Sequence, residues 1–417
     1  MLVLQGGGAL GAYQAGVYER LAEAQLEPDW LAGISIGAIN AALIAGNAPG
    51  QRVARLREFW RRVALPLQPW WMSIPVEHDW SAGYALAFGV PGFFSPHVTP
   101  AALATPGSDA ALSFYDTAPL RATLQELVDF ERIARGPLRL SVGAVEVCSG
   151  DSRWFDSARE TLRVEHVLAS AALPPGFPPV TIDGVAYWDG GIVSNTPLQF
   201  VLDQPLQRDL LVFQIDLFSA CGPMPRTLAD VAEREKDIRY SSRTRLNTDV
   251  ARRLHTLRRH AERLVAQLPP SLRASPSARA LLADCGAHGV TLVHLVHRRK
   301  QDDRASKDFE FEPATLAAHW RMGAEDTVRT LSSSAWTRRT ASHGDVRVID
   351  AAHDPRLGSN PSLSNVALAP LDPVHQRRPS SGRRCSSSPL RQCWVECRGS
   401  HERTDTSLAS ATLPGAP

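Results

Sequence analysis

Gly33-Ile34-Ser35-Ile36-Gly37 lies between a short apolar run, Trp30 to Ile34, and an Ala-rich segment, Ala38 to Ala45. This order predicts a strand, a sharp turn and a helix, with Ser35 at the tip of the turn. The flanking Gly33 and Gly37 lack Cβ atoms, so the turn can be tight and the backbones around it can pack closely. Ser35 is therefore a candidate nucleophile. G-x-S-x-G alone is a weak signal, because small-residue loops often produce it.

The segment before this turn completes a βαβ unit. Met1 to Gln5 is a short apolar run typical of a central parallel strand, and Gly6-Gly7-Gly8-Ala9-Leu10-Gly11 follows it. A helix is predicted from about Ala12 to Ala24, and Asp29 to Ile34 is the next strand. We therefore expect an α/β fold in which the first strands are parallel and the crossover between them is right-handed.

Further elements are predicted along the rest of the chain. Apolar runs predict strands at residues 138–147, 209–217 and 290–297, and a hairpin with Asp183-Gly184 as its turn joins 180–182 to 185–188. Helical spacing predicts helices at residues 52–63, 164–172 and 313–331, and one long helix or a helical pair at 228–268.

Composition divides the chain into three parts. Residues 1–205 are predicted to form the catalytic core, 206–332 a C-terminal extension packed on it, and 333–417, rich in Ser, Pro, Arg and Gly, a disordered tail. Within the core, residues 50–110 form an aromatic-rich insertion. Its aromatic residues favour packing on the core, and a lipid-facing cap is the alternative. They are Trp60, Trp70, Trp71, Trp80, Tyr84, Phe88, Phe93 and Phe94.

Bulk properties exclude several classes of protein. A net charge of +2 over 417 residues argues against nucleic-acid binding through bulk electrostatics. The N-terminus has no basic segment or cleavage site typical of a secretory signal, and no apolar run is long enough to span a membrane. The six cysteines lack the paired spacing of a metal site or disulfide framework. We expect a cytoplasmic protein without a metal.

Three glycine-containing loops follow predicted strands, and in open α/β sheets such loops converge on one crevice. Ser35 needs a base to accept its proton, and Asp189, in Asp189-Gly190-Gly191, is the candidate because partial burial would raise its pKa. The N–H groups of Gly6, Gly7 and Gly8, close to a helix N-terminus, can stabilise an oxyanion. The three loops fit acyl transfer.

Two alternatives use the same residues. Residues 6–11 also satisfy G-x-G-x-x-G, but a dinucleotide site needs a carboxylate near the end of the second strand, where this chain has Gly33-Ile34-Ser35. A Ser-Asp-His triad would need one of the histidines after Asp189, and none of them has a distinguishing loop context. We therefore expect a Ser–Asp dyad and no nucleotide cofactor. The histidines considered are His255, His260, His288, His294, His297 and His319.

The motifs resemble those of the patatin-like phospholipase family. The resemblance is carried by residues 6–17, 33–40 and 189–191, and by 169–174 and 177–180 before the aspartate. It implies a patatin-type three-layer α/β/α fold with a mostly parallel sheet, related to the α/β-hydrolases. It also implies Ser35 as nucleophile, Asp189 as proton acceptor, the Gly6–Gly8 loop as oxyanion hole, and Gly11, Gly33, Gly37, Gly190 and Gly191 as motif glycines.

One position departs from the family pattern. Many members have Arg or Lys just before the last glycine of the first motif, whereas this chain has Leu10. The loop thus loses a cation that could attract a phosphate, so ester hydrolysis is better supported than a phospholipid preference. Residues up to about 331 resemble the C-terminal extension of a bacterial subgroup.

These observations predict a serine lipid acyl hydrolase without a cofactor. Its expected partners are a lipid or acyl-ester substrate and, peripherally, a membrane surface; nucleic acid and nucleotide are excluded. The alternative is a membrane-surface lipid-binding protein with weak or vestigial esterase activity, in which the aromatic insertion and the Arg-rich helix at 228–268 contact the membrane.

Overall fold

The computed structural model describes residues 1–65, 79–204, 209–242, 244–283, 289–298, 307–338 and 346–350. Most of the elements expected from the sequence are present, and the 228–268 segment is a pair of helices. The strands are β1 (Leu2–Leu4), β2 (Trp30–Gly33), β3 (Ser95–Pro96), β4 (Tyr115–Asp116), β5 (Arg139–Glu146), β6 (Ser152–Asp156), β7 (Val180–Ile182), β8 (Val185–Asp189), β9 (Leu210–Asp216), β10 (Val290–Val296) and β11 (Val346–Ile349).

The α-helices are α1 (Gly11–Glu23), α2 (Ile36–Ala45), α3 (Pro49–Arg62), α4 (Asp79–Phe88), α5 (Asp109–Leu112), α6 (Ala118–Leu127), α7 (Phe130–Arg135), α8 (Val164–Ser170), α9 (Leu198–Leu202), α10 (Leu228–Tyr240), α11 (Thr244–Gln267), α12 (Pro270–Arg273), α13 (Pro276–Ala283), α14 (Pro313–Leu331) and α15 (Ser334–Thr337). Short 3-10 helices are η1 (Gly8–Leu10), η2 (Ala101–Leu103) and η3 (Gly190–Ile192).

The described strands form a mixed, mostly parallel sheet of nine strands. Its order is β11-β10-β9-β1-β2-β5-β8-β7, and β6 pairs with β5 off this path. All neighbours from β11 to β5 are parallel, whereas β6 and β8 pair antiparallel with β5, and β7 with β8. The carboxyl ends of β1 and β2, where the Gly6–Gly8 loop and Ser35 follow, therefore meet at one edge of the sheet.

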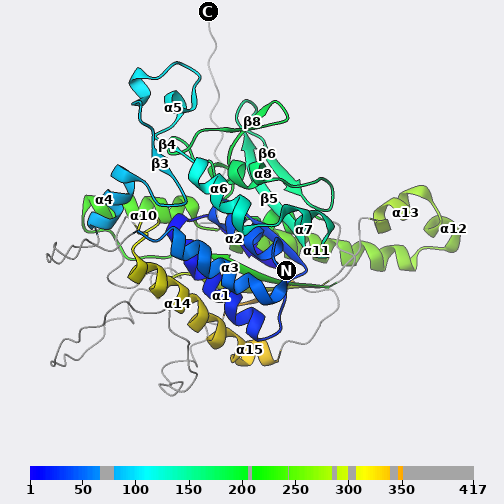
Figure 1. Cartoon of the computed structure of the whole chain (residues 1–417). Helices are drawn as coiled ribbons and strands as arrows, with labels where there is room; N and C mark the ends of the chain where they lie inside the picture. The colour runs from blue at the N-terminus through cyan, green and yellow to red at the C-terminus, as the bar shows by residue number, and fades with distance from the viewer. Residues whose placement is uncertain are drawn as a thin grey trace, which may run out of the picture. The chain divides into compact units, whose positions relative to one another are not determined.

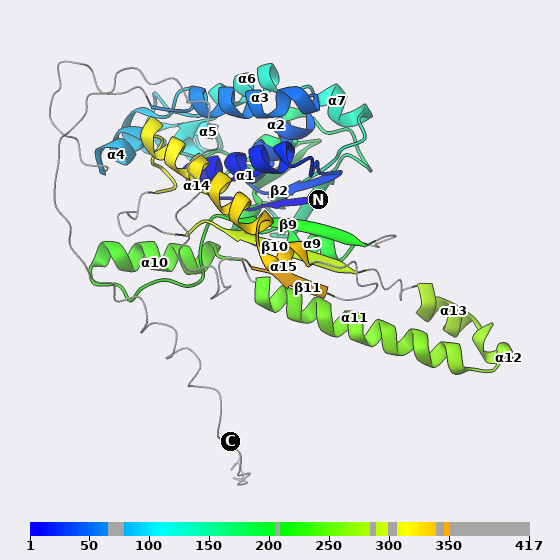
Figure 2. The same cartoon turned by 90° about the horizontal axis from the view of Figure 1, so that it is seen from below.

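Alternation along β1 shows how the sheet is covered on both faces. Leu2 and Leu4 belong to the apolar cluster that includes residues of α1, α2, α3 and α14. Met1 and Val3 point to the other face, into a cluster with Leu198 of α9. Figure 2 shows these helices on opposite sides of the sheet, with α11 on the α9 side. The arrangement is the expected three-layer α/β fold.

The segment expected as an extension contributes strands to the sheet itself. Leu2 of β1 pairs with Phe213 of β9, and β10 continues the parallel order. Helix α14 packs along α1, as Figure 1 shows. At their crossing, a Cβ on Gly16 would lie 1.9 Å from the Trp320 carbonyl oxygen, and one on Gly323 would lie 2.0 Å from that of Tyr13. Only glycine permits this approach.

The segment expected to be a tail begins with ordered structure. Helix α15 lies at its start, and Trp336 packs its ring against Phe213 at a centroid distance of 5.6 Å. Strand β11 pairs with β10 at the edge of the sheet. The expectation of a tail from residue 333 is therefore wrong for these two elements, because tertiary packing outweighs their polar composition. Residues 351–417 lie outside the described residues.

The aromatic insertion divides into an inward and an outward part. Phe93 and Phe94 are buried in the main cluster, and the Trp60 indole N–H donates to Oδ1 of Asn40 at 3.2 Å. In contrast, Tyr84 and Phe88 on α4 are exposed and pack against each other. Trp70 and Trp71 lie outside the described residues, as does the side chain of Trp80. The packing interpretation thus holds for the inward residues.

Candidate active site

Ser35 occupies a strained turn between β2 and α2. Its φ of 56° and ψ of −128° lie where non-glycine residues are rarely found, a conformation that costs on the order of 1–3 kcal/mol. The glycines on either side permit the turn. A Cβ on Gly33 would lie 2.4 Å from the Gly37 carbonyl oxygen, and one on Gly37 would lie 2.3 Å from that of Leu4. The pentapeptide therefore forms a strained strand-turn-helix elbow packed directly on β1.

Ser170, the last residue of α8, holds the elbow from outside. The Ser35 N–H donates to both the carbonyl oxygen and Oγ of Ser170, at 3.0 and 3.1 Å. Ser170 Oγ donates in turn to the Gly143 carbonyl on β5 at 2.7 Å, and the side chain is fully buried. These bonds link Ser35 to β5, the strand that pairs with Asp189.

The Gly6–Gly8 loop lies against Ser35. A Cβ on Gly6 would come within 2.9 Å of Ser35 Cβ, so the loop lies directly against Ser35. The Gly6 N–H donates to the Asn195 carbonyl at 3.3 Å. Among the described residues, no acceptor pairs with the N–H groups of Gly7 and Gly8. These two groups, at the start of η1 and α1, remain available for an anion.

The loop is also held by the C-terminal part of the chain. The Ala9 N–H donates to the Asp308 carbonyl at 2.9 Å, and Gly8, with a φ of 54°, approaches that carbonyl so closely that a Cβ would lie 2.2 Å from it. Asp308 accepts from Lys236 of α10 at 2.6 Å. The positions of Gly7 and Gly8 therefore depend on residues beyond 205.

Asp189 ends β8 and is buried, with 1 % of its surface exposed. Its backbone pairs with Ala144 of β5, and its Oδ1 accepts from the Gly191 N–H at 2.7 Å. Among the described residues, no hydrogen-bond partner of regular geometry meets Oδ2. A Cβ on Gly190 would lie 2.6 Å from the Gly143 carbonyl, so the glycine lets the turn lie flat on β5.

Burial sets the proton affinity of this carboxyl group. Loss of solvent raises the pKa of Asp189 from 3.8 to about 7, although hydrogen bonds from the Ser35 hydroxyl and the Gly191 N–H each lower it. Ser35 is thus close enough for its hydroxyl to interact with the carboxylate. A carboxyl with a pKa near 7 is a stronger proton acceptor than an ordinary aspartate and is still partly ionised at neutral pH.

Two amide side chains that the sequence did not single out support the loop. Asn195 Nδ2 donates to the Gly6 carbonyl at 3.0 Å and to that of Tyr240 at 3.2 Å. Gln5 is fully buried; it donates to Thr196 and Tyr240 and accepts from two backbone N–H groups after β9. A polar residue closing an apolar strand, as Gln5 does, is the one sequence signal that indicates such a role.

The described histidines bind partners away from Asp189. His294 Nε2 lies 2.5 Å from Oδ2 of Asp216, and His297 Nε2 lies 3.0 Å from Nδ1 of His319. His288 and the side chain of His255 lie outside the described part, and His260 is exposed on α11. In the portion of the chain that the structure describes, no group of three or more His, Cys, Asp or Glu side chains is placed to hold a metal ion.

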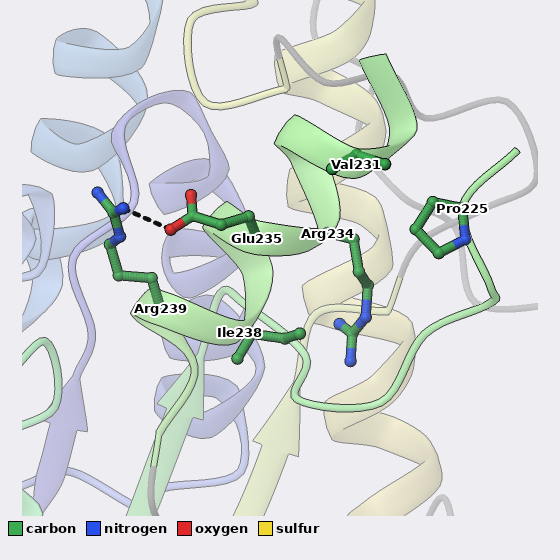
Figure 3. Close-up of a pocket in the computed structure, with 6 residues that line it drawn as sticks. All are labelled: Pro225, Val231, Arg234, Glu235, Ile238 and Arg239. Atoms are coloured by element: carbon green, nitrogen blue, oxygen red, sulfur yellow. Dashed lines mark ion pairs between the residues drawn. The ribbon is translucent and has the colours of Figure 1, made fainter. Parts of the chain in front are cut away.

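A pocket opens on α10, as Figure 3 shows. Its charged side chains are already engaged: Arg239 pairs with Glu235, and Arg234 donates to the carbonyl of Ser219 at 3.1 Å. These three charged side chains therefore already have partners among the described residues. The pocket is lined by Pro225, Val231, Arg234, Glu235, Ile238 and Arg239.

Two family models match long segments of the chain. A model described as patatin-like phospholipase matches residues 2–202, and one described as patatin phospholipase matches residues 238–343. No curated protein matches the chain. VipD from Legionella pneumophila is a similar solved structure, with 15% identity and a TM-score of 0.32; the match covers 78% of this chain and 65% of VipD. At that TM-score the assignment rests on the two family models. The chain belongs to the patatin-like phospholipase family, whose members are generally lipid acyl hydrolases.

Proposed function

We propose that this protein is a serine lipid acyl hydrolase that cleaves acyl esters through a Ser35–Asp189 dyad and an acyl-enzyme intermediate. The observation that carries the proposal is the pairing of a serine in a strained elbow with a buried carboxylate. Oδ2 of that carboxylate has no regular partner among the described residues, and its pKa is raised to about 7.

The first half of the reaction forms the acyl-enzyme. Ser35 Oγ attacks the ester carbonyl carbon while its proton passes to Oδ2 of Asp189. The carbonyl oxygen becomes an oxyanion, which the N–H groups of Gly7 and Gly8 stabilise. When the intermediate collapses, the C–O bond to the alcohol breaks, and the alcohol leaves with the proton from Asp189.

The second half regenerates the enzyme by hydrolysis. Asp189, again ionised, takes a proton from a water molecule as that water attacks the acyl carbon. The bond to Ser35 Oγ breaks, the fatty acid leaves, and the proton returns to the serine. Gly6 is less suited to the oxyanion hole than its two neighbours, because its N–H already donates to the Asn195 carbonyl.

The site supports ester hydrolysis without a dedicated phosphate contact from the first loop. Leu10 is fully buried in the main apolar cluster. The position just before Gly11, where many family members have Arg or Lys, therefore faces the core in this chain. We therefore propose lipid acyl esters as the substrate class and no preference for a phosphate group from this position.

A fluorophosphonate probe and a p-nitrophenyl acyl ester series test the proposal together. Wild type and the matched control Ser152→Ala, an exposed serine at the start of β6, should be labelled and active. Ser35→Ala should be unlabelled and inactive, and Asp189→Asn should lose at least about a thousandfold in kcat/KM. Hydrolysis by purified, folded Ser35→Ala protein would rule the dyad out.

A further inference from the structure

Helices α11, α12 and α13 form a segment, residues 244–283, that we call the arm. Near its start α11 contacts α9 and β11, and its far end contacts α13. Between these contacts the helix runs away from the sheet, as Figure 2 shows. The catalytic groups described above lie outside this segment, so its surface needs a separate explanation.

One face of α11 is apolar and exposed. Val250, Leu254, Leu257 and Leu264 recur at helical spacing and have 38%, 45%, 63% and 61% of their surfaces exposed. Positions that recur in this way lie on one stripe of the helix. Val265, beside the stripe, is buried, and α13 contacts α11, whereas the four residues of the stripe stay exposed.

The arm is also strongly basic. Residues 244–283 contain eight arginines against one aspartate and one glutamate, a formal charge of +6, whereas the whole chain carries +2. Arg253 and Arg258 are exposed. At 3.6 residues per turn they fall on opposite sides of the apolar stripe, so one arginine lies along each edge. Arginines in these positions can reach past the stripe to anionic groups.

We infer that the arm is an anchor that lays its apolar stripe into the surface of an anionic lipid bilayer. An exposed apolar stripe edged by arginine suits the boundary between acyl chains and negatively charged head groups. No helix in the described part of the chain is long and apolar enough to cross a bilayer, so the contact is peripheral.

Charge argues against two other partners for the apolar stripe, a second copy of the chain and residues 351–417. A second copy would bring two strongly basic arms together, with the edge arginines of one against those of the other. Residues 351–417 carry eight arginines against five acidic residues, so that segment has the same sign as the arm. An anionic surface is the complementary partner.

Co-sedimentation of the full chain with vesicles tests the anchor. Wild type should bind vesicles of phosphatidylcholine with phosphatidylglycerol, bind phosphatidylcholine alone weakly, and lose binding as NaCl is raised. The double variant Leu257→Glu, Leu264→Glu should bind at least about tenfold less, because two apolar contacts are lost and two negative charges are added. Arg253→Gln with Arg258→Gln should mainly reduce the preference for anionic vesicles.

Matched controls make the result specific. Leu103→Glu changes a leucine that is 78% exposed in η2 of the insertion, and it should bind as wild type does. Circular dichroism and urea unfolding should show that every variant is folded, since the changed residues are exposed. Ser35→Ala should also bind as wild type does, so anchoring and hydrolysis can fail separately.

Three results would overturn the anchor. The first is absence of wild-type binding to the anionic vesicles. The second is wild-type binding by the Leu257→Glu, Leu264→Glu variant. The third is a dimer in sedimentation equilibrium that this variant dissociates, which would assign the stripe to a second copy.

Discussion

Asp189→Asn should abolish hydrolysis and yet stabilise the protein at alkaline pH. Burial raises the pKa of the carboxyl from 3.8 to about 7, so the folded protein binds a proton more tightly than the unfolded chain does. As pH rises from about 4 to about 7, the unfolded chain releases this proton before the folded protein does. The free energy of unfolding therefore falls by about 1.4 kcal/mol per pH unit across this window.

The size of the effect follows from the same shift. The penalty is below about 1 kcal/mol at pH 4, about 2 kcal/mol at pH 5 and about 4 kcal/mol at pH 8, where it no longer grows. Asparagine cannot ionise and therefore avoids it. Its Oδ1 can still accept from the Gly191 N–H, and its Nδ2 replaces the buried Oδ2 beside Ser35.

Urea unfolding of wild type and Asp189→Asn at pH 5 and pH 8 measures this directly. The variant should gain more stability over wild type at pH 8 than at pH 5, by about 2 to 3 kcal/mol. Asp183→Asn is the matched control. Asp183 is exposed in the β7–β8 turn with a φ of 49°, which asparagine tolerates, so the change should stay within about 0.5 kcal/mol at both pH values. Equal stability differences at the two pH values, or an Asp189→Asn protein less stable than wild type at pH 8, would refute the argument.

Three further predictions follow from the site and its supports. The kcat/KM for a neutral ester should rise with pH through an apparent pKa near 7, because Asp189 must be ionised to accept the proton; a profile that stays flat down to pH 5 contradicts this. Asn195→Ala removes the hydrogen bond to the Gly6 carbonyl, which holds the proposed oxyanion loop, together with the bond to the Tyr240 carbonyl of α10, so kcat should fall on the order of tenfold with KM little changed in steady-state kinetics; a loss confined to KM would assign Asn195 to substrate binding. Gly323→Ala forces a methyl group against the Tyr13 carbonyl and should lower the free energy of unfolding by at least about 2 kcal/mol, whereas Gly83→Ala on α4, where the added methyl meets open space, should be neutral or slightly stabilising in the same urea titration.

The sequence predicted those parts of the site whose determinants are local. Strand, turn and helix around Ser35 follow from an apolar run, two glycines and an Ala-rich segment, all close together in the chain. The Asp183-Gly184 turn likewise places Asp189 at the end of a hairpin strand. These elements were predicted well because each depends on neighbouring residues.

The supports of the site could not be predicted in this way. Ser170 meets Ser35 across 135 positions, and Asn195 reaches the Gly6 carbonyl across 189. Neither residue shows a local pattern that indicates its partner. Strand β6 was missed because only its last two residues are buried, and β11 because it is short and lies in polar sequence.

The position of β1 has a consequence for how the chain is synthesised. Leu2 of β1 is made among the first residues of the chain. Phe213, with which it pairs in the sheet, leaves the ribosome only after residues 2–202, the segment matched by the first family model. Until then one edge of β1 has no partner, and the face of α1 that meets α14 waits for residues 313–331. Because domains generally fold as units during synthesis, the nascent core exposes a strand edge and an apolar helix face for most of translation. The interval before α14 emerges is thus the period in which the nascent chain exposes the surfaces most prone to aggregation.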